Sequence, residues 1–264
     1  MSAAGSALDL SVPQLALALL LVGVVIAISI RQGLSIGGDL VLGALRAVVQ
    51  LYLVGFILAL VFRAARWYWV LLILAVMTAV AAHAATSRLA KPIPGGRGIA
   101  TFALTVSTAV TLVYVIGVIV RVRPWYDPQY IIPIAGMILG SAMTSAALAG
   151  DRLQGDLRVR ADEVEARLAL GFSGREAVQP MARMALRAAM IPTVNGMMTV
   201  GLVQLPGMMT GQILAGSSPL LAIKYQLVVV FMQAAATALA ALLFVRLTVG
   251  RYLTPAHQFR RSLL

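Results

Sequence analysis

The chain has 264 residues, of which 61% are hydrophobic and 11% are charged, and its mean hydropathy is +0.93. This composition lies outside the range of soluble globular domains and indicates an integral membrane protein. The chain contains no cysteine, which excludes disulfides, thiolate metal sites and cysteine redox chemistry. The formal net charge of +12 is large for so apolar a chain, and its distribution along the sequence therefore carries information.

Seven segments are candidates for membrane-spanning helices. Crossing about 30 Å of hydrocarbon takes roughly 20 mostly apolar residues. Six segments satisfy this requirement: 12–30, 40–62, 67–87, 99–120, 130–149 and 221–246. A seventh, 188–205, is shorter and ends at Pro206. We therefore predict an all-α polytopic membrane protein with about seven transmembrane helices, built as a single transmembrane domain over residues 1–264. The first apolar run is expected to remain in the protein, because no basic signal-peptide region precedes it.

Basic residues are unevenly divided between the two sides of the predicted membrane. The loops after the first, third, fifth and seventh segments hold fifteen Lys and Arg residues, whereas the opposite loops hold four. Because cytoplasmic loops retain Lys and Arg, this asymmetry predicts an N-terminus outside and a C-terminus in the cytoplasm. The net charge then serves orientation and contact with anionic membrane lipids, and no nucleic-acid partner is expected.

Residues 151–187 form the one long polar stretch, with seven arginines and six acidic residues. Within it, residues 160–170 show a helical period in which one stripe is apolar and the remainder is charged. That stripe consists of Ala161, Val164 and Leu168. Gly171 is expected to end this helix.

A second helix is predicted after Gly171. Ser173 can cap it together with Glu176 three residues later, and Pro180 is expected to bend the chain toward the membrane. Two short helices on the inner membrane face would form a docking platform for a partner, and an ordinary interhelical loop is the alternative interpretation.

Polar side chains within the apolar segments are candidates for a transport pathway, because such groups tend to face the bundle interior or a water-filled cavity. The candidates are Arg46, Gln50, His83, Ser141, Thr144, Asn195, Met198, Gln204, Met209 and Gln212. The further amides Gln226 and Gln233 could line a route or bridge helices. Ser145 lies with Ser141 and Thr144 in a segment that has Gly136 and Gly140 at GxxxG spacing, so packing or a dimer contact is the alternative interpretation of this face.

Three of these candidates also have structural interpretations. Arg46 and Gln50 lie four residues apart and share a helical face, but Arg46 is close enough to the inner end to snorkel. His83 is a lone imidazole, which cannot coordinate a metal by itself, so a packing or interfacial role is the alternative. No Asp or Glu falls clearly within a predicted span, so a transported cation would meet only amides, hydroxyls, thioethers, His83 and aspartates at the margins of the spans. Metal ligands therefore stay unidentified.

The tetrapeptide Gly-Met-Met-Thr occurs twice, at 196–199 and 207–210. Eleven residues are about three helical turns, so in one continuous helix the copies would share a face. Pro206 intervenes, and it predicts a break near residues 205–207 that lines a cavity or is buried. The four methionines could form a thioether site suited to Cu(I), or they could serve as flexible packing residues.

Four stretches carry a resemblance to a known family. They are RAVVQ at 46–50, IPIAGMILGSAMTSAALAGDRL, EARLALGFSGREAVQP, and IPTVNGMMTVGLVQLPGMMTGQILAG. Together they resemble the FetB family of ABC permeases, associated with bacterial iron export, and its plant relatives in aluminium tolerance. Glu165 and Ala166, followed by Gly171, are also similar to the start of the EAA loop with which ABC importer permeases contact their ATPase, although the downstream Ile-x-Leu-Pro is missing.

The resemblance implies a permease domain in which residues 151–187 couple to an ATPase, with Glu165, Ala166, Gly171 and Glu176 as coupling candidates. The chain has no G-x-x-x-x-G-K-[ST] phosphate loop, so we expect a non-hydrolytic subunit that binds no cofactor itself. ATP and magnesium are then expected in a cognate ABC ATPase subunit.

The resemblance further implies a homodimer in the bacterial cytoplasmic membrane and export of a metal ion such as iron. One alternative keeps the ABC permease and changes the substrate to an organic or amphipathic molecule, such as a lipid, a sugar nucleotide or a drug. Another is a stand-alone secondary carrier or membrane scaffold.

Overall fold

The computed structural model describes residues 11–33, 37–64, 66–87, 89, 91–254, 256 and 258–263. Within these ranges the protein is helical, with only two isolated β-bridges, which confirms the predicted all-α class. The helices are α1 (Val12–Arg31), α2 (Gly37–Ala64), α3 (Trp67–Ser87), α4 (Gly96–Tyr114) continued by a π-helical segment (Val115–Val120), α5 (Pro128–Val159), α6 (Ala161–Ala169), α7 (Gly174–Thr199), α8 (Gly207–Leu214), α9 (Pro219–Tyr252) and a final 3₁₀ turn (Arg261–Leu263).

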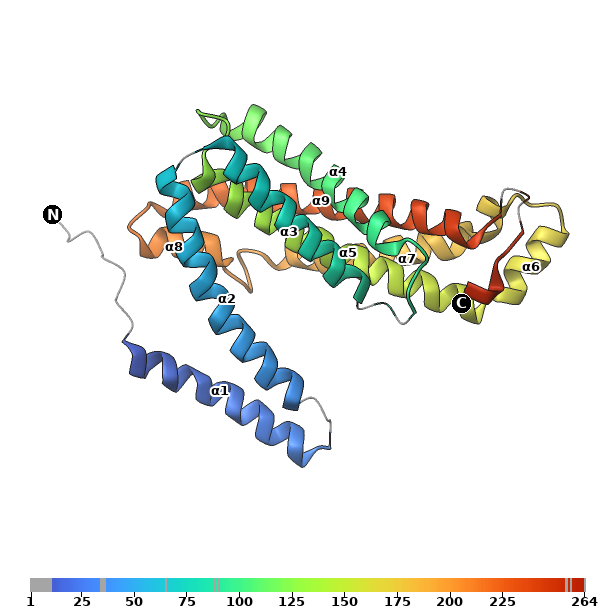
Figure 1. Cartoon of the computed structure of the whole chain (residues 1–264), viewed down its shortest axis with the longest axis horizontal. Helices are drawn as coiled ribbons and strands as arrows, with labels where there is room; N and C mark the ends of the chain where they lie inside the picture. Colours follow the sequence, from blue (N-terminus) through green and yellow to red (C-terminus); the bar gives the residue numbers. More distant parts are fainter. Residues whose placement is uncertain are drawn as a thin grey trace.

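An elongated bundle of α3, α4, α5, α7 and α9 forms the body of the molecule (Figure 1). The two longest helices, α5 and α9, pack along each other through its centre, and α6 lies at one end of the bundle while α8 lies at the other. Helices α1 and α2 form a hairpin that diverges from this body. Only the C-terminal part of α2 joins the bundle core, where Val61 is buried.

Five helices in the described part of the chain are long and apolar enough to cross a membrane: α2, α3, α4 with its π-helical continuation, α5 and α9. A shorter apolar stretch, Leu17–Arg31, lies in α1. The protein is thus an integral membrane protein, as its composition predicts. The count of seven spans and the orientation of the termini stay predictions, because α1 is short by this measure and α7 carries a charged first half.

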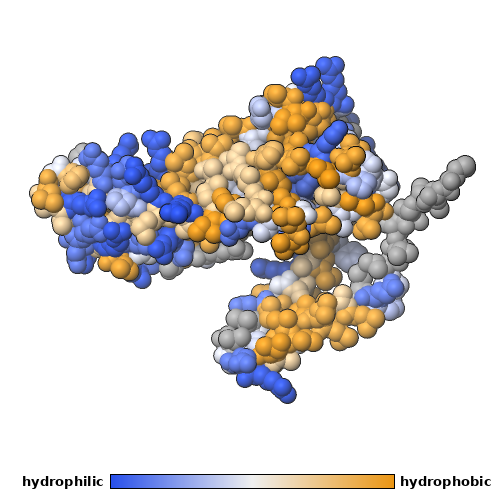
Figure 2. Space-filling model, turned by 180° about the vertical axis from the view of Figure 1, so that it is seen from behind, coloured by the Kyte–Doolittle hydropathy of each residue, from blue (hydrophilic) through white to orange (hydrophobic). Residues whose placement is uncertain are grey.

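The end of the bundle that contains α6 is polar outside and apolar inside. Figure 2 shows hydrophilic residues gathered over this end and a broad apolar surface over much of the rest of the bundle. Its core combines buried side chains from α5, α6, α7 and α9, among them Leu157, Val164, Met181 and Tyr252. Ala161 and Val164 are buried with Leu168 packed against them, so the predicted apolar stripe is confirmed.

The prediction of two short helices within residues 151–187 is wrong in one respect. The segment contains one short helix, α6, between the end of α5 and the start of α7, which continues without interruption to Thr199. Pro180 does not end α7, because Ala177, Met181 and Ala185 on either side of it are fully buried against the polar-end core. Packing of that face outweighs the hydrogen bond that proline removes.

The turn between α6 and α7 has both the glycine ending and the helix cap that the sequence predicts. Gly171 has a φ of +91°, its N–H donates to the Leu168 carbonyl, and the Phe172 N–H donates to the Arg167 carbonyl, which is a Schellman ending. Ser173 and Glu176 then form a capping box at the start of α7. Both predicted signals are confirmed.

Gly171→Ala is expected to destabilise the protein by about 1 kcal/mol, because a Cβ disfavours the left-handed backbone region. Thermal unfolding in detergent measures this as a decrease of about 2–4 °C in Tm. Gly155→Ala is the matched control, since Gly155 lies inside α5 and its added Cβ meets no atom within 4 Å. An equal decrease in both variants would contradict a conformational role for Gly171.

Candidate functional site

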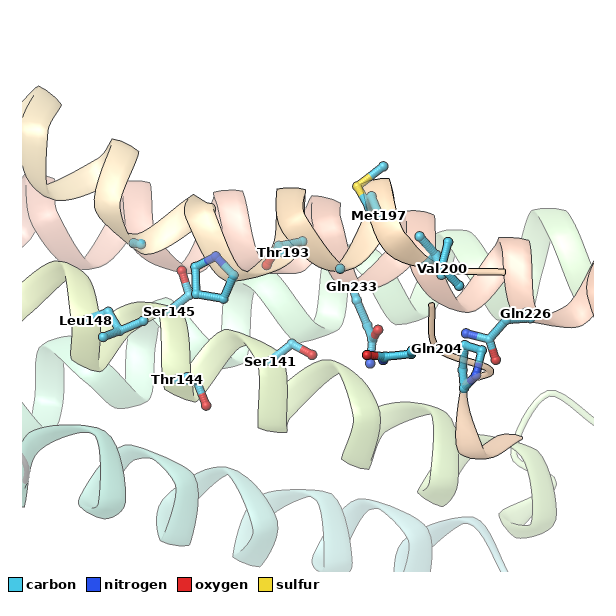
Figure 3. Close-up of a pocket in the computed structure, with 15 residues that line it drawn as sticks. Ser141, Thr144, Ser145, Leu148, Thr193, Met197, Val200, Gln204, Gln226 and Gln233 are labelled. Carbon is cyan, nitrogen blue, oxygen red and sulfur yellow. The ribbon is translucent and has the colours of Figure 1, made fainter. Parts of the chain in front are cut away.

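A polar cavity of about 300 Å³ lies between α5, α7, α9 and the 200–206 connection. Its polar lining comes from three hydroxyl-bearing positions on α5, one on α7, two amides on α9 and one amide on the connection (Figure 3). These residues are Ser141, Thr144, Ser145, Thr193, Gln204, Gln226 and Gln233. Since α5 and α9 are candidate membrane spans, the cavity gathers polar groups on helices where such groups are costly and tend to face the bundle interior.

Each of the three hydroxyls on α5 donates its proton to a main-chain carbonyl. Ser141 donates to the Met137 carbonyl at 3.0 Å, and Thr144 donates to the Gly140 carbonyl at 3.0 Å. Ser145 donates across to the Thr237 carbonyl of α9 at 3.2 Å. Because each proton is committed, these hydroxyls can offer only oxygen lone pairs to a ligand. Ser141 points toward the amides, whereas Thr144 points away from them (Figure 3).

Two of the three amides face each other in the cavity. Gln204 and Gln233 point toward each other, and Gln226 lies apart from them, farther to the right in Figure 3. Gln226 is only 7% exposed, and its Oε1 has no hydrogen-bond partner among the residues that the structure describes. A buried acceptor without a partner costs roughly 1–3 kcal/mol, which a bound ligand would recover.

Gln204 reaches the cavity because α7 ends early. After Thr199 the backbone becomes extended at Val200, and Gly201 adopts a φ of +85°. The Gly201 N–H donates to the Gln204 carbonyl at 3.0 Å, which closes a tight turn before Pro206 caps α8. The predicted helix break is therefore confirmed, and it begins several residues before Pro206.

Three of the sequence-predicted pathway residues line the cavity: Ser141, Thr144 and Gln204. The others lie elsewhere: Arg46 and Gln50 are exposed on α2, His83 is exposed on α3, Asn195 and Met198 are exposed on α7, and Met209 and Gln212 are partly buried on α8. The structure thus separates the polar residues of α2 and α3 from those of α5, α7 and α9.

Helical spacing in the sequence carries a signal for the remaining lining residues. Gln226 and Gln233 are seven apart and so share a face of α9, and Ser145 lies one turn after Ser141 on α5. Thr193 was missed, because a single threonine beside Pro192 has no distinguishing pattern. That these faces meet is a property of tertiary packing.

The methionines do not converge on one point. Met197 points away from the amides (Figure 3), Met198 is 74% exposed, and Met208 packs against the apolar core formed with α2 and α3. Within the described ranges, no group of three or more His, Asp or Glu side chains is placed to hold a metal ion. The lining of the cavity likewise has no carboxylate or imidazole among the residues described. A thioether or carboxylate metal centre therefore does not fit this site.

The coupling candidates lie at the polar end, on and after α6. Glu165 is 3.7 Å from the Arg261 guanidinium, which also contacts Asp162 at 2.8 Å, so the C-terminal turn is held against α6. Glu163 accepts hydrogen bonds from Arg160 and Arg167, and the Arg160 bond is the main reason that the pKa of Glu163 lies below its usual value.

The other coupling candidates have mixed roles. Glu176 accepts from the N–H and hydroxyl of Ser173, so its carboxylate caps α7. Ala166 is exposed on α6, and Gly171 forms the turn. That turn exposes two large apolar side chains, Leu170 and Phe172, which the sequence interpretation missed. An apolar tip on a charged unit is a feature of contact surfaces.

Comparison with known proteins places this arrangement in a family. Residues 12–253 match the Uncharacterised protein family (UPF0014). A UPF0014 membrane protein of Synechocystis is 44% identical over 212 residues, covering 80% of this chain and 82% of the relative. The probable iron export permease protein FetB of Escherichia coli is 37% identical over 244 residues, covering 92% and 93%.

The plant relative named ALUMINUM SENSITIVE 3, from Arabidopsis thaliana, is 34% identical over 245 residues, covering 93% of this chain and 88% of the relative. No solved structure matches the chain. The resemblance read from the sequence is therefore confirmed at the level of family, and the chain belongs to the UPF0014 family of membrane proteins, which includes the FetB iron export permease.

Proposed function

We propose that this chain is the permease subunit of an ABC transporter that exports a metal ion such as iron. In this proposal it works as a homodimer with seven spans per chain in the bacterial cytoplasmic membrane, its N-terminus outside, and a separate ATPase subunit supplies ATP and magnesium. One observation carries the proposal: the three helices that wall the polar cavity, α5, α7 and α9, also build the core of the polar end.

This shared construction supports mechanical coupling over distance. Helices α5 and α9 have 32 and 34 residues and continue unbroken from the polar end into the membrane-spanning part of the bundle. A displacement that an ATPase imposes on α6 would move the ends of these helices, because Leu153, Leu157 and Val245 are packed into one core with Val164. The cavity would then change shape at the other end of the same rigid elements.

Family membership supports a metal as the cargo, since the FetB relative is named as a probable iron export permease. An organic or amphipathic cargo is the second candidate, and one feature favours it. An apolar groove of about 680 Å³ lies between α3 and α4, lined by residues such as Leu74, Ala109 and Leu112. Alkyl chains fit such a surface, whereas a metal ion does not.

Co-purification with the cognate ATPase tests the proposal directly. We expect a stable complex in detergent whose ATP hydrolysis is stimulated by Fe²⁺ or Mn²⁺. Stimulation by lipids or drugs with none by metals would support the second candidate. No complex between the two intact proteins would contradict both candidates.

Leu170→Asp is expected to reduce the amount of co-purified ATPase at least about tenfold, because an unpaired carboxylate buried in the contact costs more than the roughly 1.4 kcal/mol of a tenfold change. Leu170 is 78% exposed, so the change leaves the core intact. Leu202→Asp is the control: Leu202 is 90% exposed on the connection that follows α7, far along the chain from α6. Equal recovery of ATPase with both variants would remove the α6–α7 turn from the contact surface.

A further inference from the structure

The chemistry of the cavity also bears on the form in which a metal would enter it, an inference that rests on the proposed function. A bare divalent transition-metal ion binds tightly to carboxylates, imidazoles or thiolates. The cavity lining offers none of these among its described residues, and the nearby thioethers do not converge. Direct coordination by protein ligands is therefore poorly supported at this site.

The polar groups that are present favour a partner with hydrogen-bond donors. Ser141 and Ser145 have committed their protons to main-chain carbonyls and keep oxygen lone pairs free. The Oε1 of Gln226 has no partner among the described residues but exposes almost none of its own surface, so rotation of the Gln226 amide is needed to bring this acceptor to a ligand. Neighbouring Gln204 and Gln233 can each present a further amide oxygen. Neutral oxygens arranged in this way match the outward-facing O–H groups of water molecules bound to a cation.

One helix end at the cavity, the C-terminus of α7, favours a positive charge. The last turn of α7 contributes Gly196 and Met197 to the lining, and a helix C-terminus carries roughly half a negative charge. Broken membrane helices use such ends and neutral carbonyls to hold cations. Pro206, the N-cap residue of α8, also lines the cavity, so the N-terminus of this short helix offsets part of that negative charge. Lys224 lies two residues before Gln226 on α9 and is exposed, so it projects away from this face.

The volume of the cavity agrees with a hydrated cation as its ligand. A water molecule takes about 30 Å³ of liquid volume, so six waters around an ion need about 180 Å³. The cavity of about 300 Å³ accommodates such an ion with its first shell intact. Retaining that shell also avoids the large cost of stripping a small divalent ion.

We infer that the cavity between α5, α7 and α9 binds a divalent cation as its hydrated ion, through hydrogen bonds from metal-bound water to Ser141, Ser145 and the three glutamines. Selection is then by charge and by the size of the aqua ion. The site discriminates little among Mn²⁺, Fe²⁺, Co²⁺ and Ni²⁺, since the protein does not replace their water ligands.

Hexaamminecobalt(III) tests the inference, because its six ammonia ligands do not exchange. Their N–H groups donate hydrogen bonds as the O–H groups of metal-bound water do. The complex with the ATPase is reconstituted in phosphatidylcholine vesicles, and ATP-driven Mn²⁺ transport is measured with and without this probe. We expect inhibition by hexaamminecobalt(III), and transport rates for Mn²⁺ and Ni²⁺ within about threefold of each other. No inhibition at millimolar probe, with rates rising steeply from Mn²⁺ to Ni²⁺, would overturn the inference and leave the proposed function intact.

A second arm is independent of transport. Binding of hexaamminecobalt(III) to the purified chain in detergent is measured by equilibrium dialysis for the wild type, Gln226→Leu and Gln226→Glu. We expect Gln226→Leu to weaken binding at least about tenfold and Gln226→Glu to strengthen it, because the carboxylate adds a charge-assisted acceptor. Binding without any ATP-driven metal transport would refute the proposed function alone. Equal affinity for the three proteins would overturn the inference.

Discussion

Gln233→Leu is expected to lower ATP-driven metal transport at least about tenfold while leaving the fold intact. The substitution is nearly isosteric and Gln233 is partly buried, so the loss arises from the missing amide in the cavity. Losing one good hydrogen bond to a charged ligand costs about 1.5–3 kcal/mol, which corresponds to a factor of roughly 10 to 150. Initial rates in vesicles containing the ATPase complex measure the effect, and circular dichroism checks that the helices are unchanged.

Gln204 provides the partner for this experiment, because its side chain points toward Gln233. If the two amides act as one unit, the double variant with leucine at both positions should lose little more transport than either single variant. Gln129→Leu is the control, since Gln129 is exposed in the first turn of α5 and lies outside the cavity lining. Transport by Gln233→Leu at the rate of the control would exclude Gln233 from the pathway.

Gly150→Ala is expected to destabilise the protein by about 1–3 kcal/mol, the usual cost of overpacking a filled core. An added Cβ would lie 2.7 Å from Phe244 Cε1 on α9 and 2.8 Å from Leu89 Cδ2. Phe244 is fully buried in a core that α3, α4, α5 and α9 share, so its ring has little free space into which to move. Since these two helices connect the polar end with the cavity, the variant should also lose transport in proportion to its lost folded fraction.

Thermal unfolding in detergent measures this effect. Gly140→Ala on the same helix is the control, because its added Cβ meets no atom within 4 Å. Combining Gly150→Ala with Phe244→Leu should restore part of the lost stability by making room for the methyl group. A Tm equal to that of wild type for Gly150→Ala alone would contradict the close approach of α5 and α9 at this position.

Local signals in the sequence predicted local structure well. Composition and run length identified a helical membrane protein, and the capping residues Ser173 and Glu176 together with Gly171 fixed the α6–α7 turn. These features depend on residues within one or two turns of each other, where hydrogen bonding and backbone preferences decide the outcome. Pro206 likewise predicted the break that brings Gln204 to the cavity.

Features that depend on distant packing were not accessible in the same way. The continuation of α7 through Pro180 is decided by burial of its face against α5 and α9, which no local pattern reports. Polar residues of similar type, such as Gln50 and Gln226, differ only in where their helices pack: the first is exposed on the diverging α1–α2 hairpin, and the second is buried in the cavity. The apolar pair Leu170 and Phe172 was missed because solvent exposure, and not sequence, makes it notable.

ATP-driven metal transport by the reconstituted complex is the most direct test of the account. The purified chain and its ATPase are placed in vesicles, Mn²⁺ or Fe²⁺ kept reduced is supplied on the side of the ATPase, and accumulation of the metal on the opposite side is followed after ATP is added. We expect metal movement that requires ATP, is lost with Leu170→Asp, and is strongly slowed by Gln233→Leu. Full assembly and ATP hydrolysis without any metal movement, in either direction, would contradict the account.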